Sequence, residues 1–240
     1  MPNNYFQFKQ FVVQQERAAL KVSTDSCLFG AWIADEVKSK KLKVKNALDI
    51  GAGTGLLMLM MAQKVEALID GVEIDEPTYE QAKENIAASK WKERLHLFLG
   101  DVKEIVFEKN YDLIIANPPF YEGDLKSGLS NRNVAMHDEG LKLDELLKIV
   151  DTNLSDEGCF AVLLPNHRAN KFIVDAEACY LNLIKRADVM QTIHHSYFRT
   201  MLLFGRNKPE PEIKSLSIKD EKNEYTPAFI ELLKDYYLYL

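Results

Sequence analysis

The stretch "LDIGAGTG", residues 48–55, joins an apolar run to a turn that contains three glycines. The apolar pattern of residues 46–50 predicts a buried strand, and glycine tolerates the positive φ of a tight turn after it. A dinucleotide fingerprint would need a further glycine where Leu56 stands. The acidic Asp49 before the turn would repel a pyrophosphate. The stretch therefore predicts a strand, turn and helix that bind a ligand carrying positive charge.

Strands and helices alternate on the carboxyl side of this turn. Such alternation requires crossover connections and gives a parallel sheet with helices on both faces. The last two strands are separated by a short link, which fits an antiparallel hairpin. We expect an α/β fold with a mostly parallel seven-stranded sheet and one antiparallel strand. The predicted strands are 46–50, 68–74, 95–99, 112–116, 159–164, 187–193 and 200–204, and the predicted helices are 56–63, 77–89, 143–153 and 167–180.

Composition narrows the class of protein. The chain has 240 residues, of which 47% are apolar, enough for one substantial core. No apolar run is long enough to span a bilayer, and the N-terminus lacks the order of a secretory signal, so we expect a cytoplasmic protein. The net charge of −6 argues against non-specific coating of nucleic acid, although a local basic face is compatible with it.

The cysteines and histidines indicate no metal site. Cys27, Cys159 and Cys179 include no C-x-x-C pair, and the five histidines lack metal-ligand spacing. We expect three reduced core cysteines. Two breaks, at 38–45 and 206–214, divide the chain into an N-terminal segment, 1–45, a core, 46–206, and a C-terminal linker and helix that pack on the core, 207–240.

Acidic residues end three successive predicted strands. Glu73 follows Asp49, and a carboxylate at this second strand end can accept bonds from ribose hydroxyls. Asp101 ends the third strand, where it can accept from an adenine amino group, with the Val102 backbone beside it. One such acid is commonly only a helix N-cap. Three acids after a glycine turn, with Gly51, Gly53 and Gly55 in it, predict S-adenosylmethionine as the cofactor.

The strand predicted at 112–116 ends in a second motif, "NPPF" at 117–120. Proline donates no ladder hydrogen bond and fixes φ, so the strand stops at a stiff corner. The residue before a proline is held extended, which constrains Asn117. The corner displays the Asn117 amide, the Pro118 carbonyl and the Phe120 ring. Taken alone, the motif is equally compatible with a strand end that has no chemistry.

This corner suits methylation of an amino group conjugated to a planar base. The lone pair of such a nitrogen is delocalised, so it attacks a methyl donor poorly. Oxygen atoms of Asn117 and Pro118 can accept from its two N–H bonds and favour a tetrahedral nitrogen, while Phe120 stacks on the base. We predict these three as the catalytic residues.

With these motifs in place, the chain resembles the class I, Rossmann-like methyltransferases that carry an N-P-P-[FYW] corner. Within them it resembles the bacterial family that methylates N6 of the adenosine beside the anticodon of a valine tRNA. The stretches that carry the likeness are "FQFKQFVVQQERAALKVSTDSCLFGAW", "NPPFYEGDLKSG", "NRNVAMHDEGL" and "YTPAFIELLKDYYLYL".

This resemblance implies a tRNA substrate and an N-terminal segment that covers the cofactor, with Thr24 and Asp25 in contact with it. Ser23 and Ser26 stand where the family pattern has glycines, and Met136 stands where a basic residue is expected before His137. We predict a monomer without a metal. The candidate substrate-binding residues are Tyr121, Lys126, Arg132, His137 and Arg199, and the wider basic cluster adds Lys185, Arg186, His194 and His195.

Other interpretations stay open at this point. A protein glutamine methyltransferase shares the N-P-P corner, although its usual recognition domain does not fit into the residues before the first core strand. Other RNA or DNA adenines are compatible, because the corner reads an amino group. A module that binds the cofactor without chemistry is the third alternative.

Overall fold

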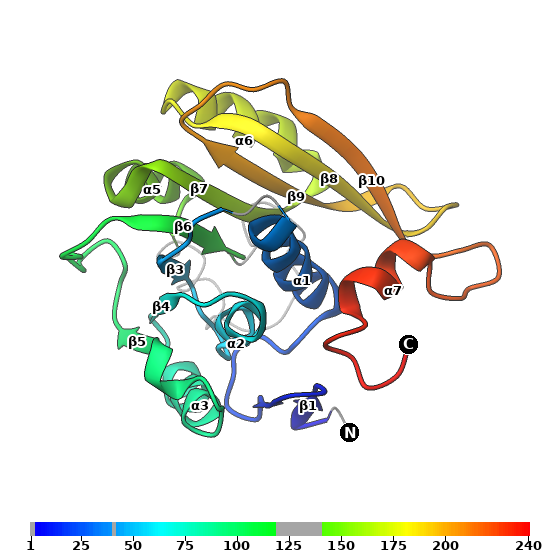
Figure 1. The fold of residues 1–240 in the computed structure, drawn as a ribbon, viewed down its shortest axis with the longest axis horizontal. Coiled ribbons are helices and arrows are strands. Elements are labelled where there is room, and N and C mark those ends of the chain that lie inside the picture. The colour runs from blue at the N-terminus through cyan, green and yellow to red at the C-terminus, as the bar shows by residue number, and fades with distance from the viewer. Residues whose placement is uncertain (1–2, 40–41, 119–140) are drawn as a thin grey trace, which may run out of the picture.

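The computed structural model describes residues 3–39, 42–118 and 141–240 and folds them around one sheet (Figure 1). Its eight strands are β3 (Asn46–Ile50), β4 (Leu68–Glu73), β5 (Leu95–Leu99), β6 (Tyr111–Ala116), β7 (Leu154–Pro165), β8 (Asn182–Thr192), β9 (Tyr197–Gly205) and β10 (Glu212–Lys219). In space they follow the order β10-β8-β9-β7-β6-β3-β4-β5. A separate hairpin near the N-terminus pairs β1 (Tyr5–Gln7) with β2 (Val12–Gln14).

The strand directions confirm the predicted mixed sheet. β9 runs antiparallel to both of its neighbours, β7 and β8, and all other pairs in this sheet are parallel. β8 and β9 form the hairpin that their short link indicated.

The spatial order of the strands reverses between β3 and β6. The chain runs outward from β3 to β4 and β5 and then returns to β6 on the other side of β3. Ile50 at the end of β3 lies opposite Ala116 at the end of β6. Ligands of such sheets bind at the carboxyl ends of the strands, where the order reverses. The turn after Ile50 and the corner after Ala116 therefore lie at the same edge of the sheet, where the sequence predicts a ligand crevice.

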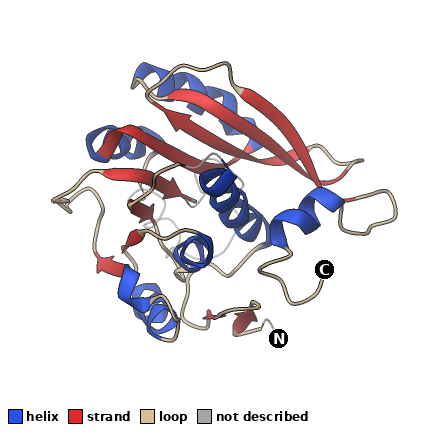
Figure 2. Cartoon of the chain, in the orientation of Figure 1, coloured by secondary structure: helices blue, strands red, loops and turns tan. Residues whose placement is uncertain are grey.

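Helices cover both faces of the sheet (Figure 2). Successive side chains of β3 point to opposite faces, so Ala47 joins one apolar cluster while Leu48 and Ile50 join the other. The cluster with Ala47 contains side chains of α1 (Thr24–Ser39), α2 (Leu56–Lys64), α3 (Glu76–Ala87) and α7 (Pro227–Leu233). The second cluster contains side chains of α5 (Leu143–Asn153) and α6 (Asn166–Ala178). A short 3-10 helix, η1 (Lys92–Arg94), precedes β5.

Four elements at the two ends of the chain differ from the sequence-based expectation, namely β1, β2, α1 and β10. The predicted count of seven strands is wrong by one, because β10 lies in the segment 207–240, which was expected to hold only a linker and a helix. β10 is an edge strand with mostly exposed or half-buried residues, so it lacks an apolar run. The hairpin of β1 and β2 and helix α1 lie within 1–45, for which the sequence predicted no strand or helix bounds. Most residues of α1 are buried.

Close packing of α1 on α2 fixes the position of the N-terminal segment. A Cβ atom at Gly30 of α1 would lie 2.7 Å from Met60 Sδ of α2, so a larger residue would push the two helices apart. Because α2 directly follows the glycine turn, this contact holds the start of α1 close to the crevice.

The remaining expectations concern cysteines, metals and membranes. None of the three cysteines forms a disulfide, and burial raises the pKa of the Cys27 thiol to about 12, which leaves it unreactive at neutral pH. Within residues 3–39, 42–118 and 141–240, no cluster of three or more His, Cys, Asp or Glu side chains has the geometry of a metal site. No helix in the same ranges combines the length and apolarity needed to cross a bilayer.

A buried ion pair joins the N-terminal and C-terminal parts of the fold. Lys185 on β8 is 7% exposed and Glu36 on α1 is 4% exposed. The Lys185 ammonium bonds to a Glu36 carboxylate oxygen, and its second contact is Glu212 of β10 at 3.3 Å. Lys185 was predicted as part of a basic surface cluster. The structure contradicts this, because its charge lies inside and is matched by two carboxylates.

Replacing Lys185 with methionine is expected to lower the free energy of unfolding by about 3–5 kcal/mol, because it removes the buried cation beside Glu36. The double variant Lys185→Met, Glu36→Leu should recover most of that loss. Urea unfolding followed by circular dichroism measures both values.

The matched control is Lys214→Met, which breaks the exposed pair of Lys214 with Glu212 at 2.5 Å. Exposed ion pairs contribute about 0–1 kcal/mol to stability. The free energy of unfolding of this variant should therefore be close to that of the unmodified protein. Equal losses for Lys185→Met and Lys214→Met would contradict the role given to the buried pair.

Candidate active site

The glycine turn between β3 and α2 has the geometry that the sequence predicted. Gly51, Gly53 and Gly55 have φ values of 76°, 55° and 77°, which favour glycine over any residue with a Cβ. The backbone N–H groups of Gly51 and Ala52 donate to the Val72 carbonyl of β4, at 3.0 and 2.9 Å. A Cβ built on Gly51 would meet no atom within 4 Å. The turn is thus fixed to the sheet on one side and open on the other.

Asp49 lies immediately before this turn, and its side chain is fully buried. Neither of its carboxylate oxygens has a hydrogen-bond partner among the described residues. Burial, and secondarily the negative charge of Glu73, raise the pKa of Asp49 to about 8. A buried carboxyl group without hydrogen bonds is costly to the fold. A ligand cation placed against Asp49 would remove this cost.

Glu73 connects the turn to the end of β4. One carboxylate oxygen accepts from the Gly53 N–H at 2.8 Å, and the other accepts from the Asp75 N–H at 2.9 Å. A carboxylate oxygen has two lone pairs, so each keeps capacity for one more donor. The predicted contact of Glu73 with ribose hydroxyls therefore stays compatible with the geometry and stays a prediction.

Asp101 and Val102 follow the neighbouring strand β5. Asp101 Oδ1 accepts from the Lys103 N–H at 2.9 Å, and Oδ2 lies 3.3 Å from the Lys103 ammonium. Val102 is buried in the apolar cluster that contains Ile50 and Val72. The Asp101 carboxylate thus shapes a turn at the rim of the crevice, and its predicted bond to an adenine amino group stays a prediction.

These residues fit the predicted cofactor, S-adenosylmethionine. Asp49 offers a buried, unpaired carboxylate to a cationic group. The open side of the turn lets a ligand approach the backbone at Gly51 closely. Glu73 and Asp101 extend the acidic line along the ends of β4 and β5. A nucleoside with amine and sulfonium charges matches this arrangement of groups.

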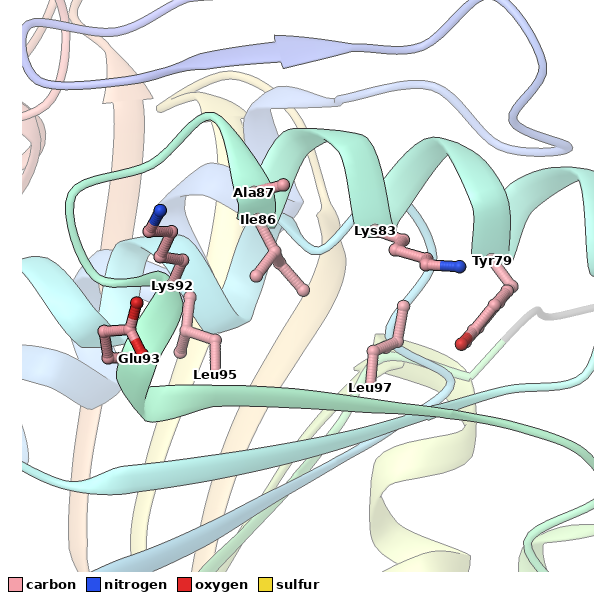
Figure 3. Close-up of a pocket in the computed structure, with 8 residues that line it drawn as sticks. All are labelled: Tyr79, Lys83, Ile86, Ala87, Lys92, Glu93, Leu95 and Leu97. Atoms are coloured by element: carbon pink, nitrogen blue, oxygen red, sulfur yellow. The ribbon is translucent and has the colours of Figure 1, made fainter.

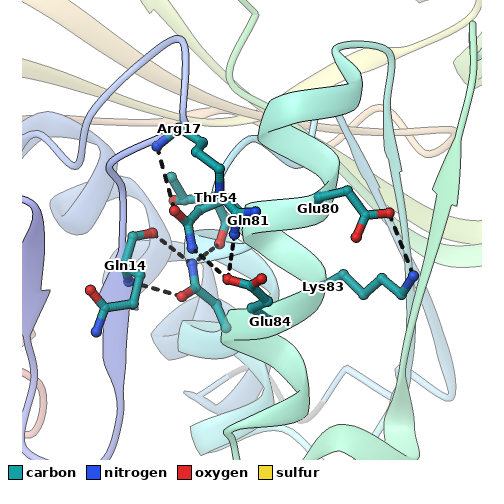
Figure 4. A network of polar contacts seen from close by, with 8 residues as sticks. Gln14, Arg17, Thr54, Glu80, Gln81, Lys83 and Glu84 are labelled. Atoms are coloured by element: carbon teal, nitrogen blue, oxygen red, sulfur yellow. Dashed lines mark hydrogen bonds and ion pairs between the residues drawn. The ribbon is translucent and has the colours of Figure 1, made fainter.

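A strap formed by residues 14–22 lies against α3 and the glycine turn (Figure 4). The buried Asn85 side chain of α3 accepts from the Gln14 N–H at 2.8 Å, and its amide nitrogen donates to the carbonyls of Gln14 and Thr54, both at 2.9 Å. Arg17 forms an ion pair with Glu84. Asn85 therefore joins the strap directly to the turn.

The Asn-Pro corner follows β6, the neighbour of β3. Asn117 is partly buried and Pro118 is buried. The Asn117 amide nitrogen Nδ2 donates to Ser26 Oγ of α1 at 2.9 Å. No described residue donates to Asn117 Oδ1, so this acceptor keeps its bonding capacity. The other predicted residues of this region, Phe120, Tyr121, Lys126, Arg132 and His137, lie outside the described residues.

The structure brings together two residues that were given different roles. Asp25, predicted for the cofactor, accepts from Arg199 Nε at 2.7 Å, and Arg199 was predicted for the substrate. Thr24, the other predicted cofactor residue of this segment, lies close to the Tyr237 hydroxyl. The start of α1 is thereby connected to β9 and to the C-terminal segment.

The predicted basic cluster is largely paired within the protein. Arg186 donates from Nε to both oxygens of Asp188, at 3.0 and 2.9 Å, and from a terminal nitrogen to Asn170 at 2.7 Å. His194 and His195 are exposed in the turn after β8. The phosphate-binding rim expected near 185–199 is therefore much reduced, because Lys185, Arg186 and Arg199 form ion pairs within the protein.

Sequence reasoning missed Ser26 and Asn85 as residues of the site. Neither position carries a recognisable motif, since each matters only through the segment that the fold places beside it.

A hollow of about 330 Å³ between α3 and β5 is lined by Tyr79, Lys83 and Leu97 among others (Figure 3). None of its lining residues belongs to the predicted site, so it is separate from the crevice.

Comparison with known proteins agrees with this geometry. The family model described as methyltransferase small domain matches residues 31–163, more than half of the chain. Solved structures share the fold. A predicted O-methyltransferase from Agrobacterium tumefaciens aligns with a TM-score of 0.66 at 12% identity, over 88% of this chain and 96% of that one. A putative class I S-adenosylmethionine-dependent methyltransferase from Listeria monocytogenes aligns with a TM-score of 0.62 at 14% identity, over 83% of this chain and 68% of that one.

Relatives with established names match along nearly the whole chain. A tRNA1(Val) (adenine(37)-N6)-methyltransferase of Flavobacterium johnsoniae is 41% identical, covering 97% of this chain and 99% of that protein. The proteins of the same name from Phocaeicola vulgatus and Klebsiella pneumoniae are 38% and 36% identical, again over almost their full lengths. The chain therefore belongs to the methyltransferase small domain family and to the family of these tRNA1(Val) (adenine(37)-N6)-methyltransferases, whose cofactor is S-adenosylmethionine.

Proposed function

We propose that this protein transfers the methyl group of S-adenosylmethionine to the exocyclic N6 nitrogen of an adenine in tRNA. The proposed target is the adenosine next to the anticodon of a valine tRNA, the activity for which the full-length relatives are named. Within this chain, one observation carries the proposal. The Asn117 corner lies beside the glycine turn because β6 pairs with β3 in the register that sets Ala116 opposite Ile50.

The corner supplies the chemistry that an adenine amino group needs. Asn117 Oδ1 and the Pro118 carbonyl oxygen accept from the two N6 hydrogens, which holds the nitrogen and turns its lone pair out of conjugation. The bound cofactor supplies an electrophilic methyl group on its sulfonium. The nitrogen becomes acidic once it carries the methyl group, so it loses one proton without a strong base. Phe120 is proposed to stack on the base.

The remaining residues are proposed to hold the cofactor and the substrate. Residues 1–45 cover the cofactor site, which agrees with the strap over Thr54, while residues 46–206 form the core. The substrate base leaves its stack, which costs little in an anticodon loop. A monomer acting in the cytoplasm stays a prediction. Thr24, Asp49, Glu73, Asp101 and Val102 are assigned to the cofactor, and Tyr121, Lys126, Arg132 and His137 to the tRNA.

Incubating the protein with unmodified valine tRNA and cofactor labelled in the methyl group should produce labelled N6-methyladenosine in a nuclease digest. Asn117→Ala should lower kcat by about 100-fold, because it removes a fixed acceptor for the N6 hydrogens. Its affinity for the cofactor, measured by calorimetry, should stay unchanged.

The matched substrate control is the same tRNA with guanosine in place of the target adenosine, which should remain unlabelled. A digest without N6-methyladenosine would refute the tRNA activity. Label recovered in protein instead would favour the glutamine methyltransferase alternative.

The affinity for S-adenosylmethionine should rise with pH between 6 and 7.5, by up to about tenfold per unit. The reason is that the pKa of Asp49 is raised to about 8, so below this pH the carboxyl group is mostly protonated and must lose its proton to pair with the ligand cation. Calorimetry in two buffers of different ionisation enthalpy should detect the released proton.

Asp49→Asn cannot ionise, so this variant should bind more weakly at pH 7.5 and should show a flat pH profile. Glu177→Gln, at an exposed position of α6, serves as the charge-matched control and should keep the slope. A profile without slope in the unmodified protein would show that Asp49 does not face the cationic part of the cofactor.

A further inference from the structure

The orientation of the Asn117 amide decides whether the proposed reaction can occur. The oxygen and nitrogen ends of an asparagine amide are nearly equal in size, so packing alone distinguishes them poorly. Only the oxygen end can accept from a substrate amino group. With the amide reversed, two donors would face each other at the reacting nitrogen. A device that selects one orientation would therefore act directly on the rate.

A line of hydrogen bonds runs from Asn117 to the start of α1. Asn117 Nδ2 donates to Ser26 Oγ at 2.9 Å, and Ser26 Oγ lies 2.8 Å from Ser23 Oγ. Ser23 Oγ in turn donates to Asp25 Oδ1. The other oxygen of Asp25 accepts from Arg199 Nε on β9 at 2.7 Å. Five side chains from α1 and its preceding residues, β6 and β9 thus form one connected path.

The polarity of this path follows from proton counting. An ionised carboxylate can only accept, so the single hydroxyl proton of Ser23 is used on Asp25. The contact between the two serines then needs the proton of Ser26. Ser26 has no second proton, so toward Asn117 it can act only as an acceptor. The amide end that faces Ser26 must therefore be Nδ2.

We propose that Ser26, with Ser23 and the ion pair of Asp25 and Arg199, is a positioning device that orients the catalytic Asn117. It holds Nδ2 toward α1 and so turns Oδ1 away from α1 and toward the crevice. None of these side chains needs to touch the substrate to do this. The inference rests on the proposed function, because orientation matters only when Oδ1 accepts from an amino group.

The proposed device also assigns a role to the two serines that depart from the family pattern. Ser23 and Ser26 stand where glycines were expected, and glycine has no hydroxyl with which to orient the amide. It also reassigns Asp25 and Arg199, which were predicted for cofactor and substrate. Their mutual ion pair is partly buried, with side-chain exposures of 15% and 27%, and fixes the end of the path.

The test uses Ser26→Ala, Asn117→Asp and the double variant. Ser26→Ala should lower kcat on tRNA by about tenfold with little change in cofactor affinity. The reason is that the Asn117 amide loses the acceptor that holds Nδ2 toward α1. The carboxylate of Asn117→Asp has two equivalent oxygens, so its orientation does not matter. Adding Ser26→Ala to Asn117→Asp should therefore cost no further activity.

Ser215→Ala, an exposed serine on β10, is the matched control and should behave as the unmodified protein. A Ser26→Ala protein with unchanged kcat would overturn the inference. So would a loss from Ser26→Ala that is equally large in the unmodified protein and in the Asn117→Asp variant, or a loss explained by weaker cofactor binding, since both indicate a general structural role.

A measurement without substrate separates this inference from the proposed function. In ¹⁵N-labelled protein, the Asn117 side-chain amide signals are assigned by their absence in Asn117→Asp. One of the two protons should exchange slowly with solvent, and Ser26→Ala should abolish that protection. If the unmodified protein did not methylate tRNA, the proposed function would be wrong. The exchange rates of the Asn117 amide protons would still show whether Ser26 holds this amide in one orientation. Unprotected amide protons in the unmodified protein would refute the device itself.

Discussion

The parallel pairing of β3 with β6 is the constraint on which the site depends. Its register sets Ile50 opposite Ala116, and neighbouring strands lie about 4.8 Å apart. The chain leaves β3 through three glycines and leaves β6 through Asn117 and Pro118. Both exits therefore open at the same edge of the sheet. In the proposed reaction, the cofactor at the first exit and the amino group at the second would therefore occupy neighbouring strand ends.

A buried carboxylate without a described hydrogen-bond partner lies at the end of β3. Asp49 is fully buried and has no hydrogen-bond partner among the described residues, whereas Glu73 beside it accepts two backbone bonds. A ligand cation placed against Asp49, as we propose, would remove the cost of this burial. Asn117 Oδ1 is a second acceptor without a described donor. These two acceptors belong to the neighbouring ends of β3 and β6.

The two ends of the chain stabilise this crevice from outside the sheet core. Residues 14–22 reach the glycine turn through Asn85, and the start of α1 reaches Asn117 through Ser26. The middle of α1 is anchored on the C-terminal part by the buried pair of Glu36 and Lys185, which also contacts β10. The N-terminal segment thus contacts both the glycine turn and the Asn117 corner, and β10 contacts it through the ion pair of Lys185 with Glu212.

The sequence by itself determined the elements whose signals are local. Apolar runs set the seven core strands, glycines required by positive φ set the turn, and prolines set the corner after Asn117. From these alone, the cofactor class and the shared crevice were predicted. Only the tertiary structure decided the partners of Ser26, Asp25 and Arg199, the burial of Lys185 and the pairing of β10. The physical reason is that a hydrogen bond or ion pair between distant segments depends on where the fold brings their atoms. A single serine or lysine, or a partly exposed edge strand, has no periodic sequence pattern from which its partner could be predicted.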